Sequence, residues 1–182
     1  GGQNCHESKD YGAHTGHVNS RMLKNIGAHF VIIGHSENRE KGESDKLINL
    51  KIKSALEAKL KVIFCIGETL SENKKKKTQS ILSKQIKVGL KNLKNKSNII
   101  IAYEPVWAIG SGVIPKSKDL FKTVEFIKGK FKKKSPKVLY GGSVNPQNIN
   151  NLKEINNIDG FLIGGASQNA KKFIDIVKKT YN

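Results

Sequence analysis

A glutamate that follows an apolar run is the first residue of this sequence with the character of a catalytic group. The stretch from 99 to 112 reads IIIAYEPVWAIGSG, so a predicted strand of β-branched residues leads to Glu104, and Pro105 ends that strand. Enzymes of the α/β class place their chemistry at the carboxyl ends of such strands. A carboxylate held there can act as a general base, although a glutamate at a strand end is more often simply solvated. The Gly-Ser-Gly loop at 110–112 favours the functional interpretation, because small residues can hinge a loop or wrap an anion.

Other predicted strands also end in residues that can do chemistry. His35, Ser36 and Glu37 lie at the end of the strand predicted at 29–35, and two later strands end in Gly141-Gly142-Ser143 and Gly164-Gly165-Ala166-Ser167. One Gly-Gly pair is usually only a turn. The carboxyl ends of parallel strands face one side of a barrel, so these groups are predicted to converge. Exposed backbone N–H groups before a helix N-terminus are suited to phosphate.

The chain alternates apolar runs with amphipathic segments, a pattern typical of α/β proteins. The runs are apolar almost throughout, as in parallel strands covered on both faces. Strands are predicted at 29–35, 61–67, 98–104, 137–142 and 159–165, and residues 1–5 are interpreted as the stub of another strand. Helices are predicted at 19–26, 44–58, 78–94, 117–131, 147–154 and 168–180. Ser44 marks the start of the second helix, and Ser167 or Asn169 is a candidate cap for the last.

Length and composition favour one globular cytoplasmic domain. A chain of 182 residues can bury a real core, and it has no apolar run of 18 residues and no signal peptide. Cys5 and Cys65 form no spaced metal motif and are expected to be reduced. His6, His14 and His17 lack Cys or acidic partners at ligand spacing, so no metal site is expected. No membrane association is expected either.

The net charge of +18, with an isoelectric point near 9.9, suggests nucleic acid as a partner. The lysines gather at Lys74 to Lys77, Lys132 to Lys134 and Lys178 to Lys179, which are predicted to be loops or exposed helix faces. They are not interleaved with aromatic residues for base stacking, and no nucleic-acid-binding motif is present. A solvated surface is therefore favoured over nucleic-acid binding.

Six segments together resemble the triosephosphate isomerase family, in order and spacing, along essentially the whole chain. They are GAHTG at 12–16, VIIGHSENR at 31–39, CIGETL at 65–70, YEPVWAIGSG at 103–112, YGGSVNPQN at 140–148 and DGFLIGGAS at 159–167. The resemblance implies an incomplete (β/α)8 TIM barrel of about six βα units with parallel strands. It also implies that residues 1–182 form a single truncated TIM-barrel domain.

The resemblance assigns roles to particular residues. It implies that Glu104 is the base that removes a proton α to the carbonyl, that His35 polarises this carbonyl, and that Glu37 lies beside the base. It also implies a lid at residues 105–115, and a hydrogen bond from Tyr140 to the closed lid. The phosphate of a small phosphorylated triose, or free phosphate or sulfate, is expected on the backbone N–H groups of Gly110, Ser143, Gly164 and Gly165. The resemblance also implies that no cofactor and no metal are needed.

The sequence also departs from the family pattern. The first two βα units are not represented in it, and neither is the Asn-x-Lys segment of the first strand, whose lysine is a catalytic cation in the family. His17 and Asn38 replace the usual Glu and Arg of their motifs. The expected function is therefore interconversion of dihydroxyacetone phosphate and glyceraldehyde 3-phosphate that is very weak or absent. The alternative is a non-catalytic scaffold that self-assembles and retains phosphate binding. With either function, the chain is expected to form a homo-oligomer through exposed sheet edges.

Overall fold

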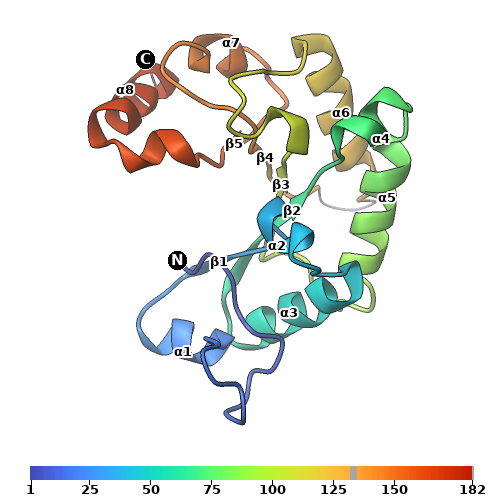
Figure 1. Ribbon diagram of the computed structural model, residues 1–182, viewed down its shortest axis with the longest axis vertical. Coiled ribbons are helices and arrows are strands. Elements are labelled where there is room, and N and C mark those ends of the chain that lie inside the picture. The colour runs from blue at the N-terminus through green and yellow to red at the C-terminus, as the bar shows by residue number, and fades with distance from the viewer. Residues whose placement is uncertain (132–134, 182) are drawn as a thin grey trace. The chain divides into compact units, whose positions relative to one another are not determined.

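The computed structural model describes residues 1–131 and 135–181, in which parallel strands alternate with helices (Figure 1). The strands are β1 (Phe30–Ile33), β2 (Lys61–Ile66), β3 (Ile99–Tyr103), β4 (Val138–Tyr140) and β5 (Gly160–Phe161), and they neighbour one another in the order β1-β2-β3-β4-β5. The main helices are α1 (Ser20–Asn25), α3 (Asp45–Glu57), α5 (Thr78–Gly89), α6 (Ser117–Gly129), α7 (Ile149–Lys153) and α8 (Ala170–Tyr181). The predicted α/β class with parallel strands is confirmed.

The chain divides into two compact units. Unit 1 comprises residues 1–66 and 82–101, and unit 2 comprises residues 67–81 and 102–182. That residues 1–182 form a single domain stays a prediction.

Unit 1 is built on the pairing of β1 with β2. The two strands are parallel and in register from Phe30 with Lys61 to Ile33 with Phe64. A parallel bridge joins Gly2 to Val31, within the residues interpreted as a strand stub, although no strand forms there. The core side chains Val31, Ile33, Val62 and Phe64 of the two strands and Ile48, Ile52 and Ala55 of α3 are fully buried. Burial of these apolar side chains is what holds α3 on the strands.

Two helices of unit 1 begin at side-chain caps. The side chain of Ser44 accepts a hydrogen bond from the backbone N–H of Leu47 and begins α3, as expected from the sequence. Asn19 caps α1 in the same way, through the N–H of Met22. Such caps satisfy backbone donors that have no partner inside the helix.

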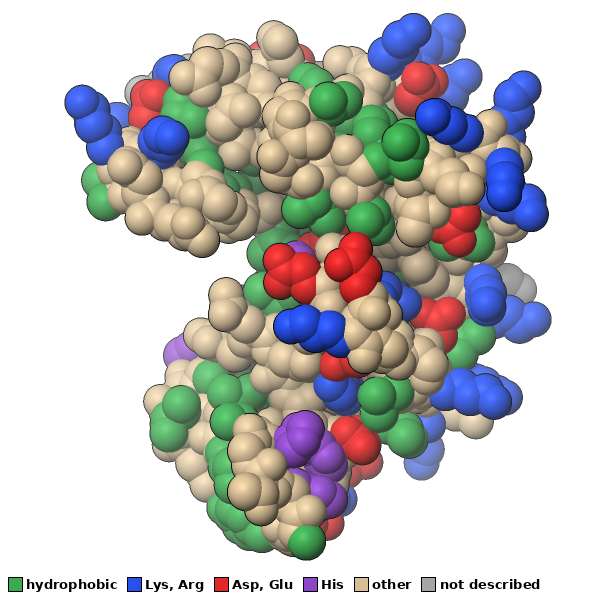
Figure 2. All heavy atoms as spheres, in the orientation of Figure 1, with side chains coloured by type: hydrophobic (Ala, Val, Ile, Leu, Met, Phe, Trp, Pro, Cys, Tyr) green, Lys and Arg blue, Asp and Glu red, His purple; other side chains and the backbone are tan. Residues whose placement is uncertain are grey.

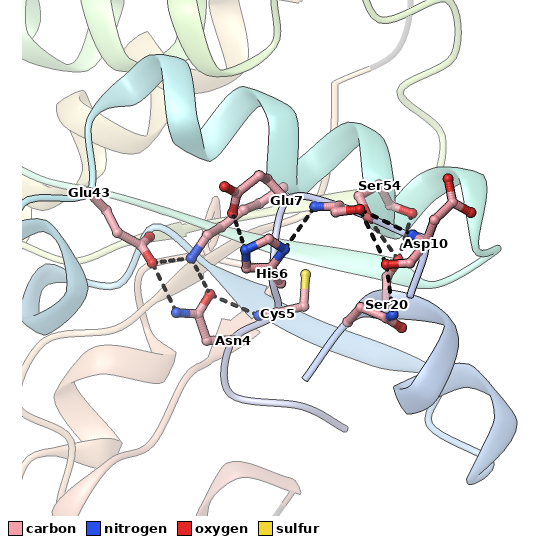
Figure 3. A network of polar contacts seen from close by, with 11 residues as sticks. Asn4, Cys5, His6, Glu7, Asp10, Ser20, Glu43 and Ser54 are labelled. Carbon is pink, nitrogen blue, oxygen red and sulfur yellow. Dashed lines mark hydrogen bonds and ion pairs between the residues drawn. The ribbon is translucent and has the colours of Figure 1, made fainter. Parts of the chain in front are cut away.

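A buried polar network ties the start of the chain to α3 (Figure 3). The Lys51 ammonium contacts the carboxylate of Glu43 and donates to Asn4 Oδ1 at 3.2 Å, while Asn4 Nδ2 donates to Glu43 at 2.9 Å. The side chains of Lys51 and Glu43 are only 8% and 11% exposed, so each charge depends on the other for its compensation.

Unit 2 contains the end of β3, together with β4 and β5. β4 and β5 are parallel, with Leu139 opposite Gly160 and Tyr140 opposite Phe161. The N–H of Gly141 donates to the Tyr103 carbonyl at 2.9 Å and links β4 to β3. Buried apolar side chains come from helices α6, α7 and α8: Leu120, Val124, Ile127, Ile149, Leu152 and Ile176.

The elements differ from the predicted ranges mainly at their ends. β5 has two residues where seven were predicted, and its Gly160 adopts a φ of +152°, a conformation that L side chains rarely take. α5 ends at Gly89 and not near residue 94, and the chain then turns with a φ of +59° at Asn92. Two short helices were not predicted: α2 (Ser36–Glu40) and α4 (Leu70–Lys74), each a few residues after the end of a strand.

The basic residues do not form one surface patch in the view of Figure 2, where lysine and arginine side chains lie at several separate places. Lys74 to Lys77 are exposed, as predicted, and of the pair on α8 Lys178 is exposed and Lys179 half-buried. The third predicted cluster, Lys132 to Lys134, lies outside the described residues. No helix in the described part of the chain is long and apolar enough to cross a bilayer.

Candidate active site

Glu104 follows the last residue of β3 and is 2% exposed. Two glycines make room for it. An ideal Cβ on Gly141 would lie 2.7 Å from Glu104 Cγ, and one on Gly67 would lie 1.7 Å from the Glu104 carbonyl oxygen. Any other residue at either position would displace the glutamate. Glu104 thus lies at a strand end, as predicted. Its low exposure keeps the residue away from bulk water.

The segment after Glu104 starts with a 3₁₀ helix, η1 (Val106–Ala108), and continues into an exposed loop. Gly110 and Gly112 have φ values of +65° and +77°, which favour glycine. Val113, further along the loop, is 53% exposed. An anchored first turn followed by glycines in left-handed conformations is an arrangement suited to a hinged loop.

Glu68 is a candidate site residue that the sequence interpretation missed. It is fully buried, and its carboxylate accepts hydrogen bonds from Tyr103 Oη (3.2 Å), Trp107 Nε1 (3.1 Å) and Asn73 Nδ2 (3.0 Å). Its carbonyl also accepts from the Val106 N–H at 3.0 Å. Glu68 therefore anchors η1 and with it the start of the loop. The signal was available, because Gly67-Glu68 ends a predicted strand as His35 and Glu104 do.

The candidate anion-binding residues lie on two parts of unit 2. The N–H of Gly112 donates to Ser143 Oγ at 3.2 Å, so the loop after β3 meets the one after β4. Gly164 and Gly165 are exposed, with open space where a Cβ would be, and Gly165 begins the 3₁₀ helix η2 (Gly165–Gln168). Helix α8 follows, capped by Asn169, whose Oδ1 accepts from the Lys172 N–H at 3.0 Å. Asn169, one of the two predicted candidates, is thus the cap.

Tyr140 is the last residue of β4. Its hydroxyl is buried and has no hydrogen-bond partner in the described part of the chain, and an ideal Cβ on Gly142 would lie 2.2 Å from it. Burial raises the pKa of Tyr140 well above its usual value. The hydrogen bond from Tyr140 to a closed lid stays a prediction.

Unit 1 carries the other two candidate catalytic residues, His35 and Glu37. His35 is the N-cap of α2, and its Nδ1 accepts from the Glu37 N–H at 3.4 Å. A neutral imidazole that accepts at Nδ1 carries its proton on Nε2 and can donate there. The Glu37 carboxylate is 76% exposed, with Oε2 at 4.0 Å from His35 Nδ1. Proximity of Glu37 to the base stays a prediction.

Arg39 holds the strand ends around His35 in place. Its guanidinium donates to the carbonyls of Gly34 (2.7 Å) and Cys65 (3.0 Å), at the ends of β1 and β2, and pairs with Asp45 at 2.7 Å. A planar guanidinium with several donors suits this bracing role.

The histidine cluster near the start of the chain is close-packed. The ring centroid of His6 lies 4.2 Å from that of His14 and 4.9 Å from that of His17. No group of three or more His, Cys, Asp or Glu among the described residues is arranged to hold a metal ion. Cys5 and Cys65 are both buried free thiols.

Comparison with known proteins identifies the family of this chain. The family description "Triosephosphate isomerase" matches residues 1–180. The chain belongs to the triosephosphate isomerase family. The triosephosphate isomerase of Thermodesulfovibrio yellowstonii is 45% identical over 174 residues, and that of Chlorobium phaeobacteroides is 43% identical over 183 residues. These alignments cover 92% and 96% of this chain, and 71% and 73% of the relatives.

A crystal structure of triosephosphate isomerase from Bartonella henselae superposes on the chain with a TM-score of 0.89 and 40% identity. The match covers 100% of this chain and 76% of the crystallised one. The predicted TIM-barrel fold with a reduced number of units agrees with this result. About a quarter of the crystallised chain has no counterpart among the 182 residues.

Proposed function

We propose that this chain is an aldose–ketose isomerase of the triosephosphate isomerase type, acting on dihydroxyacetone phosphate and glyceraldehyde 3-phosphate with strongly reduced turnover. Glu104 is the base and His35 the electrophile in this proposal. The observation that carries the proposal is the position of Glu104, which is buried at a strand end and packed closely against Gly67 and Gly141. Such a reaction belongs to cytoplasmic sugar metabolism.

The chemistry explains the residue types. A proton that moves between two adjacent carbons needs one carboxylate within reach of both, in a site from which water is excluded. Negative charge develops on the substrate oxygens as the proton leaves, and a neutral imidazole N–H can stabilise that charge. Glu37 is proposed to assist beside the base.

The substrate phosphate is proposed to bind the backbone N–H groups of Gly110, Ser143, Gly164 and Gly165. Gly164 and Gly165 support this role because they are exposed and precede the capped N-terminus of the 12-residue helix α8. Binding at this point would also provide the energy for closing the loop at 105–115.

Turnover is proposed to be low because the family's first-strand lysine has no counterpart among the 182 residues. Removal of one charge-stabilising group typically costs about 10² to 10³ in rate, or roughly 3 to 4 kcal/mol. Misplacement of catalytic groups by about 1 Å costs another factor of about 10². Together these effects predict activity at least about 10⁴-fold below that of a complete family member.

A coupled assay of isomerisation on the purified chain tests the proposal. Residual turnover should disappear in Glu104→Gln and persist in Glu125→Gln, which changes an exposed glutamate on α6. Turnover close to that of a complete enzyme would show that another cation replaces the lysine. Residual turnover that survives Glu104→Gln would remove Glu104 from its proposed role.

A second candidate is a non-catalytic scaffold that self-associates and keeps phosphate binding. It is favoured by the exposed apolar side chains of α8, which indicate an unfilled contact surface. Absence of turnover together with amide shifts at Gly165 and Ser143 in millimolar phosphate would support it. No shift at Gly165 would remove the anion site.

A further inference from the structure

Four consecutive lysines, Lys74 to Lys77, form a motif that the proposed function leaves without a role. They are exposed at the end of α4 and in the turn that joins it to α5. No ion pair joins them to a carboxylate in the described part of the chain. Lys76 has a φ of +57°, so the chain turns sharply there. The residue after this basic turn is Thr78, the first residue of α5.

The Thr78 hydroxyl is connected to the start of the loop at 105–115 by hydrogen bonds within unit 2. Its Oγ1 accepts from Asn73 Nδ2 at 3.3 Å. The same nitrogen donates to the Glu68 carboxylate at 3.0 Å, and that carboxylate accepts from Trp107 Nε1 at 3.1 Å. A relay of three hydrogen bonds, through Asn73 and Glu68, therefore links Thr78 to η1.

The Glu68 carboxylate in this relay is sensitive to charge. It is fully buried, and its side-chain donors in the described part of the chain, Tyr103, Trp107 and Asn73, are all neutral. A buried carboxylate without a cationic partner is destabilised when a second negative charge comes near or when a donor leaves. A change at Thr78 can therefore loosen the anchor of the loop.

We propose that Thr78 is a phosphorylation site and that its phosphate loosens this anchor. The lysines at 74–77 are complementary to the acidic cleft of a protein kinase that selects basic residues before its target. In the transfer, the Thr78 oxygen bonds to the γ-phosphorus of ATP and its proton passes to the catalytic aspartate of the kinase. The bond from that phosphorus to the β,γ-bridging oxygen breaks, and ADP leaves. The inference concerns the loop anchor and does not depend on turnover.

The surroundings of Thr78 favour a phosphate. α5 has no acidic residue in its first turn. A phosphate on Thr78 adds about 1.5 to 2 negative charges at the positive end of this helix and beside the lysines. Its oxygens accept hydrogen bonds more strongly than the hydroxyl does, so Asn73 is drawn away from Glu68. The phosphate also repels the Glu68 carboxylate, and both effects weaken the bond from Trp107.

The first experiment treats the purified chain with ATP and the catalytic subunit of cyclic-AMP-dependent protein kinase, which selects basic residues before its target. Peptide mass spectrometry is expected to find phosphate on Thr78, and Thr78→Val should remove it. Ser117 is the matched control. It is exposed and begins α6 as Thr78 begins α5, but only one of the four residues before it is a lysine. Absence of phosphate on Thr78, or equal phosphorylation of Ser117, would overturn the proposal.

The second experiment measures the fluorescence of Trp107, the only tryptophan in the chain. Phosphorylation is expected to raise the acrylamide quenching constant at least about twofold, since the indole loses its buried acceptor. The phosphorylated chain carries no substitution, so its comparison with the untreated chain does not depend on how a variant folds. Asn73→Ala removes the relay and should make the response to phosphorylation smaller.

Thr78→Glu and Ser80→Glu distinguish the relay from a general effect of charge. Both place a carboxylate in the first turn of α5, but the Ser80 hydroxyl donates to the Lys77 carbonyl at 2.8 Å and is not part of the relay. Thr78→Glu should raise the quenching constant, and Ser80→Glu should leave it unchanged. Equal responses of the two variants, or unchanged quenching in the phosphorylated chain, would show that no relay runs from Thr78 to Trp107.

Discussion

The hydroxyl of Tyr103 donates a hydrogen bond to the buried carboxylate of Glu68, 3.2 Å from Oε2. Tyr103 is the residue before Glu104, so this bond fixes the backbone next to the proposed base. The same carboxylate holds the indole of Trp107. One buried glutamate thus positions both the end of β3 and the start of the loop.

Tyr103→Phe is expected to destabilise the chain by about 1 to 3 kcal/mol, because it leaves a buried carboxylate with one donor fewer. Tyr140→Phe is the matched control. It removes a buried hydroxyl for which the described residues offer no partner, and it should be neutral or slightly stabilising. Urea unfolding of the two variants measures the difference. Equal losses of stability would show that Glu68 does not anchor Tyr103.

Gly67→Ala is expected to lower the free energy of unfolding by more than about 2 kcal/mol, since its Cβ would meet the Glu104 backbone at 1.7 Å. Backbone atoms cannot move aside as a flexible side chain can. Gly129→Ala, at the end of α6 with open space around it, should stabilise by up to about 1 kcal/mol. Equal unfolding free energies for the two variants would show that Gly67 is not packed closely against the Glu104 backbone.

Lys51→Ala is expected to cost about 3 to 5 kcal/mol in urea unfolding, because Glu43 is left as an unpaired buried charge. Lys46→Ala, on the exposed face of the same helix, should cost less than about 0.5 kcal/mol. The double change Lys51→Met with Glu43→Leu should recover much of the loss. A small effect of Lys51→Ala alone would show that water reaches the network.

Stability should fall as the pH rises above 9, because burial raises the pKa of the Cys5 thiol from its usual 9.0 to about 11. Below pH 9 the thiol is protonated in both states. Between pH 9 and pH 11 only the unfolded chain releases the proton, and this favours unfolding by up to roughly 3 kcal/mol.

Unfolding experiments at pH 8 and pH 10 on the unchanged chain and on Cys5→Ala measure this contribution. The comparison is needed because the pKa values of Tyr103 and Tyr140 are also raised and affect stability at higher pH. Between pH 8 and pH 10, the chain with Cys5 should lose more stability than Cys5→Ala does. A constant difference would contradict the burial of Cys5.

The sequence predicted the strands, the longer helices and the position of Glu104, because these depend on local patterns of apolar residues and caps. Ser44 caps the helix that it was expected to cap. The short helices α2 and α4 were missed because neither buries an apolar side chain, whereas the equally short α7 buries Ile149 and Leu152 and was predicted. The role of Glu68 was missed for another reason. Its partners Tyr103 and Trp107 are 35 and 39 residues away along the chain.

The strand order follows the order of synthesis, because each strand pairs with the strand made just before it. During translation, the partner of every emerging strand is therefore already available. A βα unit of about 30 residues takes roughly 2 to 6 s to synthesise at about 5 to 20 residues per second. Helix formation and loop closure are complete within microseconds. The sheet can thus grow on the ribosome one unit at a time, and its newest edge is the part most in need of protection by a chaperone.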